Sequence, residues 1–278
     1  MNNNPLMQYF RQPAIFIRLP SQGRFYPDGA IKITPNGEYP VLPMTTIDEI
    51  TYRTPDALFN GEAVISVIQS CVPNIIDAWA MPAMDIDTVL IAIRIATYGH
   101  SMEINTKCPK CEHESDFDLD LRGVLNQITP GDYEKSVRDG DIEIFFRPMD
   151  YRQINANNLA QFEDQKLLLS VETGDRPVED KMAQLSEILK KITSVTIRAL
   201  AQSISAVKTP QAMVTDSDHI TEWLENCDRR VFALIRDHII ATKQASEIKP
   251  LTIKCPSCSH EHQQIFTLDM TSFFGGAS

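Results

Sequence analysis

The chain has 278 residues, of which 43% are hydrophobic and 23% are charged. This composition is close to that of an average globular protein and excludes a wholly disordered chain, a collagen and a coiled-coil rod. Lys and Arg total 26 against 37 Asp and Glu, a formal net charge of −11, so the average surface repels nucleic-acid phosphates and anionic lipids.

Neither a membrane span nor a secretory signal is evident in the sequence. The most apolar run, residues 89–96, is short and is interrupted by Arg94, whereas a spanning helix needs roughly 20 apolar residues. The first twelve residues lack both the basic and the apolar region of a signal peptide. We therefore expect a cytoplasmic protein whose cysteines stay reduced.

The N-terminal part is expected to be rich in short strands. Residues 13–53 alternate β-branched and aromatic runs with turn-forming Pro, Asn and Gly, which predicts short hairpins. A helix is predicted over about 55–71, because Pro55 follows a capping Thr and apolar residues then recur at helical spacing as far as Cys71. Gly61 lies inside this predicted helix, where glycine is unfavourable by about 1 kcal/mol relative to Ala.

A second helix is predicted to begin with Asp85 as its cap and to end at Gly99. Arg94 is the one basic residue on its apolar stretch. Two interpretations remain open: Arg94 extends to solvent, or it pairs with a carboxylate such as Asp56 or Asp87.

The rest of the chain divides into short strands and long helices. Residues 102–121 and 142–146 have strand patterns, and residues after Pro148 turn helical. Helices are predicted at about 151–171, 178–207 and 217–245, the last two packing against each other through apolar stripes.

The predicted fold class is therefore α+β. Four regions are expected: an N-terminal β/α region with two helices at 1–101, a first zinc knuckle with following strands at 102–147, a helical insertion at 148–247, and a second knuckle with the C-terminal tail at 248–278.

Two C-P-x-C turns form an internal repeat, one at Cys108 and Cys111 and the other at Cys255 and Cys258. Each turn follows a β-prone stretch ending in Lys, and each is followed by a His-Glu pair and a second β-prone stretch. Such a turn brings two sulfurs to one point, and two turns together supply the four thiolates of a closed tetrahedral zinc site. The sequence predicts a zinc ribbon whose two knuckles are 143 residues apart.

Other interpretations of the cysteines and histidines stay open. The two knuckles could be unpaired and have lost their metal, or their cysteines could be reduced thiols that simply pack against neighbouring residues. His113 and His260 could compete as ligands, but four thiolates leave them unnecessary, so we expect them beside the site or facing solvent. Cys71 and Cys227 lie on apolar helix faces and are interpreted as core cysteines.

Enzymatic activity is not expected. The chain lacks the common nucleophile, phosphate-loop, dinucleotide and zinc-protease motifs, and a zinc ion with four thiolates has no open position for water. A zinc-ribbon adaptor for nucleic acid is an alternative, but the knuckles are surrounded mainly by acidic residues and have no basic stripe.

Three strings carry a family resemblance: LPSQGRFYP at residues 19–27, PDALFNGEA at 55–63 and IAIRIATYG at 91–99. Together with Asp85, Asp87 and the C-P-x-C turn that follows, they resemble the baseplate hub and hub-assembly protein family of T-even-type contractile-tailed bacteriophages. The resemblance covers roughly residues 15–125 and returns at the second knuckle.

This resemblance implies a structural or assembly role in the tail baseplate hub, without enzymatic activity. It implies assembly in the host cytoplasm and a final place in the virion tail baseplate. It also implies that the partners are other hub proteins, with the tape measure protein as a further candidate. A tail-assembly chaperone that leaves before the virion matures remains an alternative.

A candidate interface lies in the first of these strings. Tight turns at Gly23, Gly29 and Gly37 could present Arg24, Phe25 and Tyr26, a combination of residue types enriched at interface centres. The alternative is that Phe25 and Tyr26 fold back onto the core.

Overall fold

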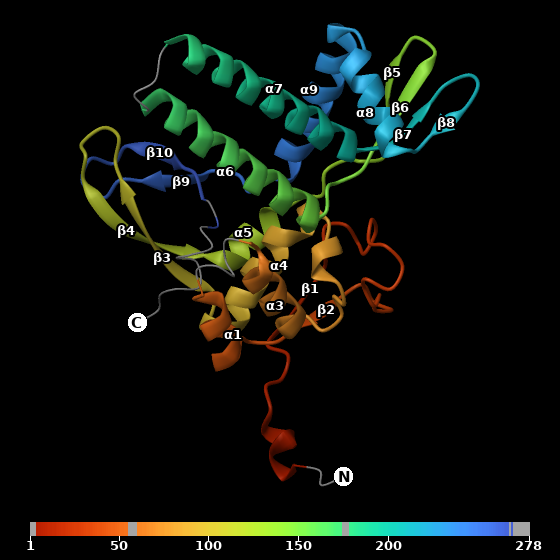
Figure 1. The fold of residues 1–278 in the computed structure, drawn as a ribbon. Helices are drawn as coiled ribbons and strands as arrows, with labels where there is room; N and C mark the ends of the chain where they lie inside the picture. The colour runs from red at the N-terminus through yellow and green to blue at the C-terminus, as the bar shows by residue number, and fades with distance from the viewer. Residues whose placement is uncertain (1–3, 55–59, 174–177, 267, 269–278) are drawn as a thin grey trace. The chain divides into compact units, whose positions relative to one another are not determined.

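The computed structural model describes residues 4–54, 60–173, 178–266 and 268 (Figure 1). The chain forms two compact units. The first comprises Met1–Pro130 together with Ser246–Ser278, and the second is Gly131–Ala245. Both units combine helices with small antiparallel sheets, which confirms the mixed helix and strand composition expected from the sequence.

The first unit begins with an exposed 3-10 helix, η1 (Pro5–Tyr9), followed by a two-stranded sheet of β1 (Ile15–Ile17) and β2 (Tyr39–Val41). Arg11 attaches the arm that carries η1. Its guanidinium donates to the carbonyl oxygen of Pro43 at 2.6 Å and to the carbonyl oxygen of Ser70 at 2.8 Å, and it forms a 3.2 Å ion pair with Asp48.

Three helices and a short 3-10 turn make the core of the first unit: α1 (Thr46–Tyr52), α3 (Glu62–Cys71), η2 (Ala78–Ala80) and α4 (Ala83–Tyr98). Thr45 and Asp48 form a capping box at the start of α1, because each side chain accepts from the other's backbone N–H. α4 buries Met84, Asp85 and every residue from Thr88 to Arg94, so it is covered on nearly all sides.

Both helix predictions in this unit need correction at their starts. α3 begins at Glu62, and residues 55–59 lie outside the described part of the chain. Gly61 precedes the helix with φ +82°, a left-handed conformation that glycine adopts without strain, so it is not an interior glycine. α4 begins at Ala83 after Pro82, and Asp85 is therefore not its cap.

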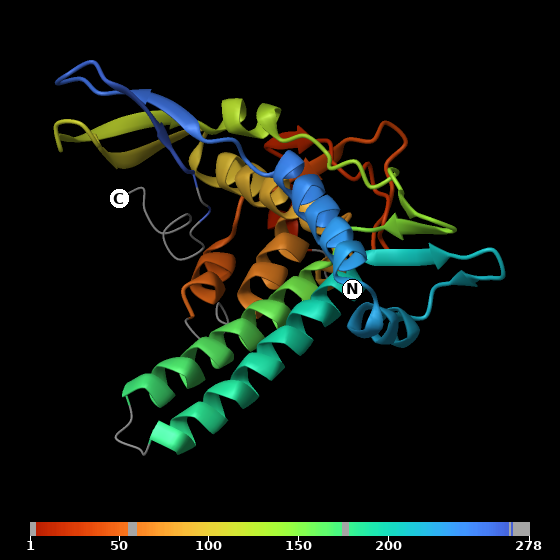
Figure 2. The same cartoon turned by 90° about the horizontal axis from the view of Figure 1, so that it is seen from above.

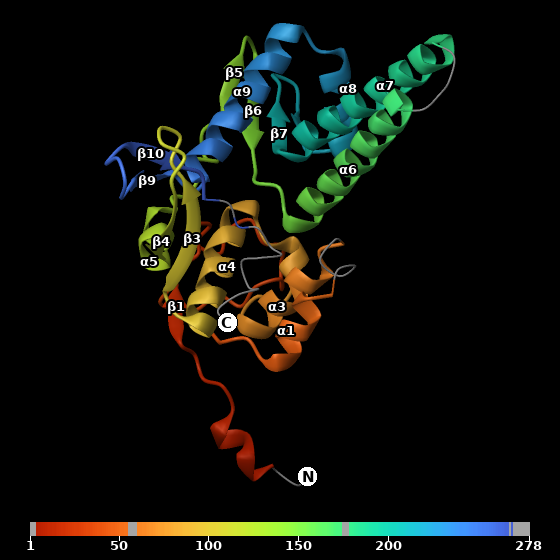
Figure 3. The same cartoon turned by 90° about the vertical axis from the view of Figure 1, so that its left-hand side faces the viewer.

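The first unit is completed by two hairpins and a short helix. β3 (Ser101–Lys107) pairs with β4 (Glu114–Asp120), α5 (Leu121–Gln127) follows, and β9 (Leu251–Lys254) pairs with β10 (Glu261–Gln264). Figure 3 shows the two hairpins, with β3 and β4 in yellow-green and β9 and β10 in blue.

In its described residues, the second unit holds a four-stranded antiparallel sheet in the order β5-β6-β7-β8 and four helices. The strands are β5 (Val137–Asp139), β6 (Ile142–Phe146), β7 (Ile204–Lys208) and β8 (Met213–Val214). The helices are α6 (Tyr151–Thr173), α7 (Val178–Gln202), α8 (Ser217–Asn226) and α9 (Arg229–Ser246).

Three details of this unit differ from the sequence prediction. The helix predicted over 178–207 ends at Gln202, and Ile204–Lys208 is instead strand β7. The helix predicted over 217–245 is two helices, separated at Cys227. The strands at 137–146, grouped above with the first knuckle, belong to the second unit because β6 pairs with β7.

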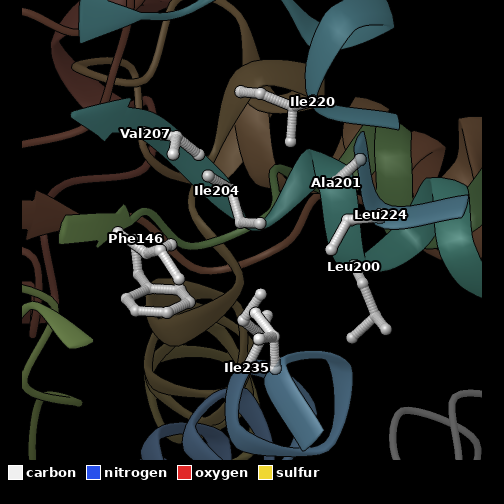
Figure 4. Close-up of a cluster of buried hydrophobic side chains, with 10 residues drawn as sticks. Phe146, Leu200, Ala201, Ile204, Val207, Ile220, Leu224 and Ile235 are labelled. Atoms are coloured by element: carbon white, nitrogen blue, oxygen red, sulfur yellow. The ribbon is translucent and has the colours of Figure 1, made fainter. Parts of the chain in front are cut away.

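A hydrophobic core of its own holds the second unit together (Figure 4). Side chains from β6, β7, α7, α8 and α9 meet there, with Ile144 and Ile235 fully buried. The remaining members are Phe146, Leu200, Ala201, Ile204, Val207, Ile220, Leu224 and Val231. The segment predicted as a helical insertion is thus an α+β unit.

Helices α6 and α7 run side by side as the two longest helices of the unit (Figure 2). Asp164 on α6 is only 2% exposed, and its carboxylate lies 2.9 Å from the ammonium group of Lys191 on α7. This ion pair fixes one helix against the other at their middle. None of the helices in the described ranges is both long enough and apolar enough to cross a bilayer.

Candidate metal centre

The first C-P-x-C turn joins β3 to β4 and is closed by its own backbone. The N–H of Cys108 donates to the carbonyl oxygen of His113 at 3.0 Å, and the N–H of Glu112 donates to the carbonyl oxygen of Cys108 at 2.9 Å. Glu112 has φ +57°, which turns the chain back toward the strand. These contacts bring the sulfurs of Cys108 and Cys111 to one side of the turn.

The second turn, between β9 and β10, repeats this geometry. Cys255 N–H donates to the carbonyl oxygen of His260 at 2.9 Å, Ser259 N–H donates to the carbonyl oxygen of Cys255 at 2.9 Å, and Ser259 has φ +56°. The sequence repeat is therefore a structural repeat, and its two copies use the same backbone hydrogen bonds.

The two turns bring four sulfurs together. Cys108 Sγ lies 3.7 Å from Cys258 Sγ, and Cys111 Sγ lies 3.7 Å from Cys255 Sγ. All four sulfurs lie within 4.8 Å of one another. A disulfide needs a separation of about 2.05 Å, so these cysteines are not bridged. Sulfurs bound about 2.3 Å from a tetrahedral metal lie about 3.8 Å apart, so the spacing fits a metal ion.

The protonation of this cluster also favours a cation. Burial raises the pKa of Cys108, but backbone N–H groups of Cys111 and Lys110 point at its sulfur and lower the pKa to about 6. At Cys111 the backbone of His113 lowers the pKa, but the adjoining sulfurs, Cys258 first, raise it to about 12. The adjoining sulfurs thus disfavour the ionised form of Cys111, and a divalent cation that displaces its proton would relieve this.

The two histidines are not among the clustered sulfur ligands, and it is their backbone groups that support the turns. His113 is exposed and His260 is half-buried, with the His260 ring stacked 6.3 Å from that of His262. Cys108 and Cys255 are each 2% exposed, whereas Cys111 is exposed and Cys258 half-buried. One side of the cluster is therefore open to solvent.

The structure separates the three candidate interface residues. Arg24 and Phe25 are exposed, and the Arg24 guanidinium carbon lies 6.0 Å from the centre of the Phe25 ring. Tyr26 instead points inward, and its hydroxyl donates to Asp85 Oδ2 at 3.0 Å.

The remaining residues considered from the sequence occupy packed positions. Cys71 is fully buried, and burial raises its pKa to about 12. Cys227 lies at the break between α8 and α9. The His238 ring lies 4.3 Å from the Phe146 ring and is tilted by 36° to it, and burial lowers the pKa of His238. Arg94 is 4% exposed and lies over the Tyr98 ring at 5.3 Å, while Asp56 lies outside the described residues.

Sequence reasoning missed the contact between Asp85 and Ser21, both at most 1% exposed. Asp85 Oδ1 accepts from the Ser21 backbone N–H at 2.8 Å, and Asp85 Oδ2 accepts from the Ser21 hydroxyl at 2.5 Å. A carboxylate at the start of a very apolar helix was the available signal, because such a group needs buried donors.

One comparison with known proteins gives a match. The model of a family described as T4 bacteriophage base plate protein matches residues 30–275. Neither the curated proteins nor the solved structures give a match.

Proposed function

Because the chain belongs to the T4 bacteriophage base plate protein family, we propose that it is a structural or assembly component of the baseplate hub, braced by a structural zinc ion. The observation that supports the zinc site is the four-sulfur cluster, whose two 3.7 Å separations suit a tetrahedral metal. Membership in the family indicates a structural role in the tail.

Zinc suits this cluster better than hard cations, because thiolates bind soft or borderline metals while Mg²⁺ and Ca²⁺ take oxygen ligands. The ligands would be Cys108, Cys111, Cys255 and Cys258. Four thiolates fill the tetrahedral positions, so the ion would connect the β3–β4 hairpin to the β9–β10 hairpin without activating water. The zinc ion would contribute to folding, and the protein would act by binding other proteins through its surface.

The partners are other phage baseplate proteins, as the family implies. Nucleic acid is a weaker alternative, because the net charge is −11 and the exposed face of β4 bears Glu114, Asp116 and Asp118. Binding to nucleic acid would require a basic surface and would weaken steeply with salt.

Quantitative mass spectrometry of purified tails and mature particles, with metal analysis of the isolated protein, tests the proposal. We expect one zinc per chain and a fixed copy number in the tail. One zinc per chain with absence from tails would instead identify an assembly factor that leaves. A protein that purifies without metal in the absence of chelators would contradict the zinc site. Cys227→Ser, outside the cluster, is the control and should keep its zinc.

A further inference from the structure

The loop from Ser21 to Tyr26 has an unfavourable backbone. Gln22 has φ +58° and Phe25 has φ +70°, both in the left-handed region that side chains with a Cβ rarely adopt. Gly23 between them has φ +78°. Such conformations persist only where surrounding contacts enforce them, and they gather at functional positions.

The buried Asp85 holds the loop in this conformation through hydrogen bonds. Its two carboxylate oxygens accept from the backbone N–H and hydroxyl of Ser21 at one end of the loop and from the hydroxyl of Tyr26 at the other. The Ser21 hydroxyl also accepts from the Gly23 N–H at 3.1 Å. A single buried carboxylate thus fixes both ends of a six-residue loop.

The loop holds two side chains outward. Phe25 is 41% exposed, with the Arg24 guanidinium beside its ring, while Ser21 and Tyr26 on either side point inward. Phe25 has no polar group on its ring, yet it is more exposed than the neighbouring Tyr26. The buried Asp85 carboxylate would be unfavourable without its hydrogen-bond donors Ser21 and Tyr26. These bonds hold Tyr26 inward, and the Phe25 ring next to it stays at the surface.

We propose that the Ser21–Tyr26 loop docks onto another baseplate protein, with Arg24 and Phe25 as its contact residues and Asp85 as the residue that positions them. This inference rests on the proposed function, because it takes the partner from the baseplate. The surface that fits is an apolar recess for Phe25 with carboxylates at its rim for Arg24, since arginine and aromatic residues dominate binding at such centres.

Site-specific photo-crosslinking in phage-producing cells tests the docking. A benzophenone amino acid replaces Phe25, and after irradiation the adduct is identified by mass spectrometry. We expect an adduct with a different baseplate protein, at a peptide that contains apolar and acidic residues. A probe at Phe162, which is 50% exposed on the second unit, is the matched control and should give at least tenfold less of that adduct. Equal yields from both positions, or an adduct between two copies of this chain, would overturn the proposal.

Variants assign the roles within the loop. Arg24→Glu lies on the surface and should lower the yield of the Phe25 adduct about tenfold, without changing metal content or melting temperature. Asp85→Asn places an amide N–H₂ where a donor already points, so it should also lower the adduct yield while the Phe162 background and the metal content stay the same. If Arg24→Glu gives the same yield of the Phe25 adduct as the wild-type protein, the proposed contact of Arg24 with the partner is refuted. This holds whether or not Asp85→Asn is stable.

These outcomes separate the docking loop from the broader proposal. If the wild-type protein is found neither in tails nor in their assembly intermediates, the proposed function fails. If it is present there and the Arg24→Glu, Phe25→Ala double variant enters at the wild-type level, only the docking loop is refuted.

Discussion

The sulfur atoms of Cys108 and Cys258 lie 3.7 Å apart although 150 positions separate the two residues in the sequence. The contact joins the hairpin that precedes the second unit in the sequence to the hairpin that follows it. A metal at this point would connect two parts of the first unit, and the sequence between them contains the whole of the second unit, Gly131–Ala245.

Removing the second knuckle's sulfurs should remove the metal. We expect Cys255→Ser together with Cys258→Ser to reduce bound zinc from one to none per chain, because two thiolates cannot complete the site. Structural zinc binding in small peptides corresponds to about 10–16 kcal/mol, so the first unit should be strongly destabilised. Metal analysis and circular dichroism check this, since the helices of the second unit should remain. Full zinc in the double variant would refute the shared site.

The stability of the first unit should depend on the protonation of Asp85. Burial raises the pKa of Asp85 from its ordinary value of 3.8 to about 6, although Ser21 and Tyr26 donate hydrogen bonds to it. The folded state therefore binds this proton more tightly than the unfolded state. The contribution to stability is complete below about pH 4 and is lost as the pH rises through about 6, with a size of about 2–3 kcal/mol.

Denaturant unfolding at pH 4.5 and 7.5 measures this effect as the difference between the wild type and Asp85→Asn. Tyr26 and Tyr39 face the carboxylate, and burial raises the pKa of both phenols, so they stay neutral over this range. Asp120→Asn is the control, because hydrogen bonds from Arg122 lower the pKa of Asp120 to about 2. A difference for Asp85→Asn that does not change between the two pH values would contradict the prediction.

Arg11 should contribute more to stability than Arg18. Arg11 is 24% exposed in its side chain and holds two carbonyl oxygens and Asp48, so Arg11→Ala should lower the free energy of unfolding by about 2–4 kcal/mol. Arg18 pairs with Glu38 at the surface, with 75% of its side chain exposed, and Arg18→Ala should cost at most about 1 kcal/mol. Equal losses in urea titrations would refute this interpretation of the Arg11 contacts.

Comparing Gly23 with Gly29, which has the same backbone conformation, measures how closely the chain at Gly23 packs against the Tyr39 hydroxyl. Gly23 and Gly29 have φ +78° and +81°, but a Cβ on Gly23 would lie 3.1 Å from the Tyr39 hydroxyl, whereas a Cβ on Gly29 meets nothing within 4 Å. Ala at either site introduces a left-handed conformation that is unfavourable by about 1–2 kcal/mol. Gly23→Ala should cost about 1 kcal/mol more by thermal unfolding, because it displaces a buried ring. Identical losses would contradict the close approach.

The second unit should be destabilised without losing the metal. Ile235→Ala removes a fully buried side chain from its core and should cost about 2–5 kcal/mol, while Ile240→Ala, at a position 45% exposed, should cost less than about 1 kcal/mol. Zinc content should be unchanged in both, since the four sulfurs belong to the first unit. A loss of zinc in folded Ile235→Ala protein would show that the two units are not independent.

The sequence predicted those elements whose structure depends on residues close together in the chain. The two C-P-x-C turns could be found because each turn closes through its own backbone within six residues. Their repetition then suggested that the sulfurs meet. The ends of α3 and α4 at Cys71 and Tyr98 were also predictable, because the apolar spacing stops at Cys71 and Gly99 follows Tyr98.

Long-range contacts account for the errors. The apolar spacing of α7 continues through Ile204, but pairing with β6 draws Ile204–Lys208 into a sheet, and that partner lies about 60 residues earlier. The sequence pattern suggested Asp85 as a helix cap, but Asp85 lies inside α4 and accepts a hydrogen bond from Ser21, which is 64 positions away. The break at Cys227 had a local signal that was overlooked, since Asp228 accepts from the Arg230 N–H at 2.6 Å at the start of α9.

The order in which the four sulfurs leave the ribosome follows from their positions. Cys255 is synthesised 144 residues after Cys111, which at about 5–20 residues per second is a delay of roughly 7–30 s. Throughout that interval the nascent chain carries only two of the four clustered cysteines, while the second unit, Gly131–Ala245, is being synthesised. A cation bound at that stage would have half of the proposed ligands and would exchange with the cellular pool. If the proposed zinc site forms, tight binding of the metal requires that translation has reached the last hairpin, and a chain truncated before Cys255 should bind the metal more weakly.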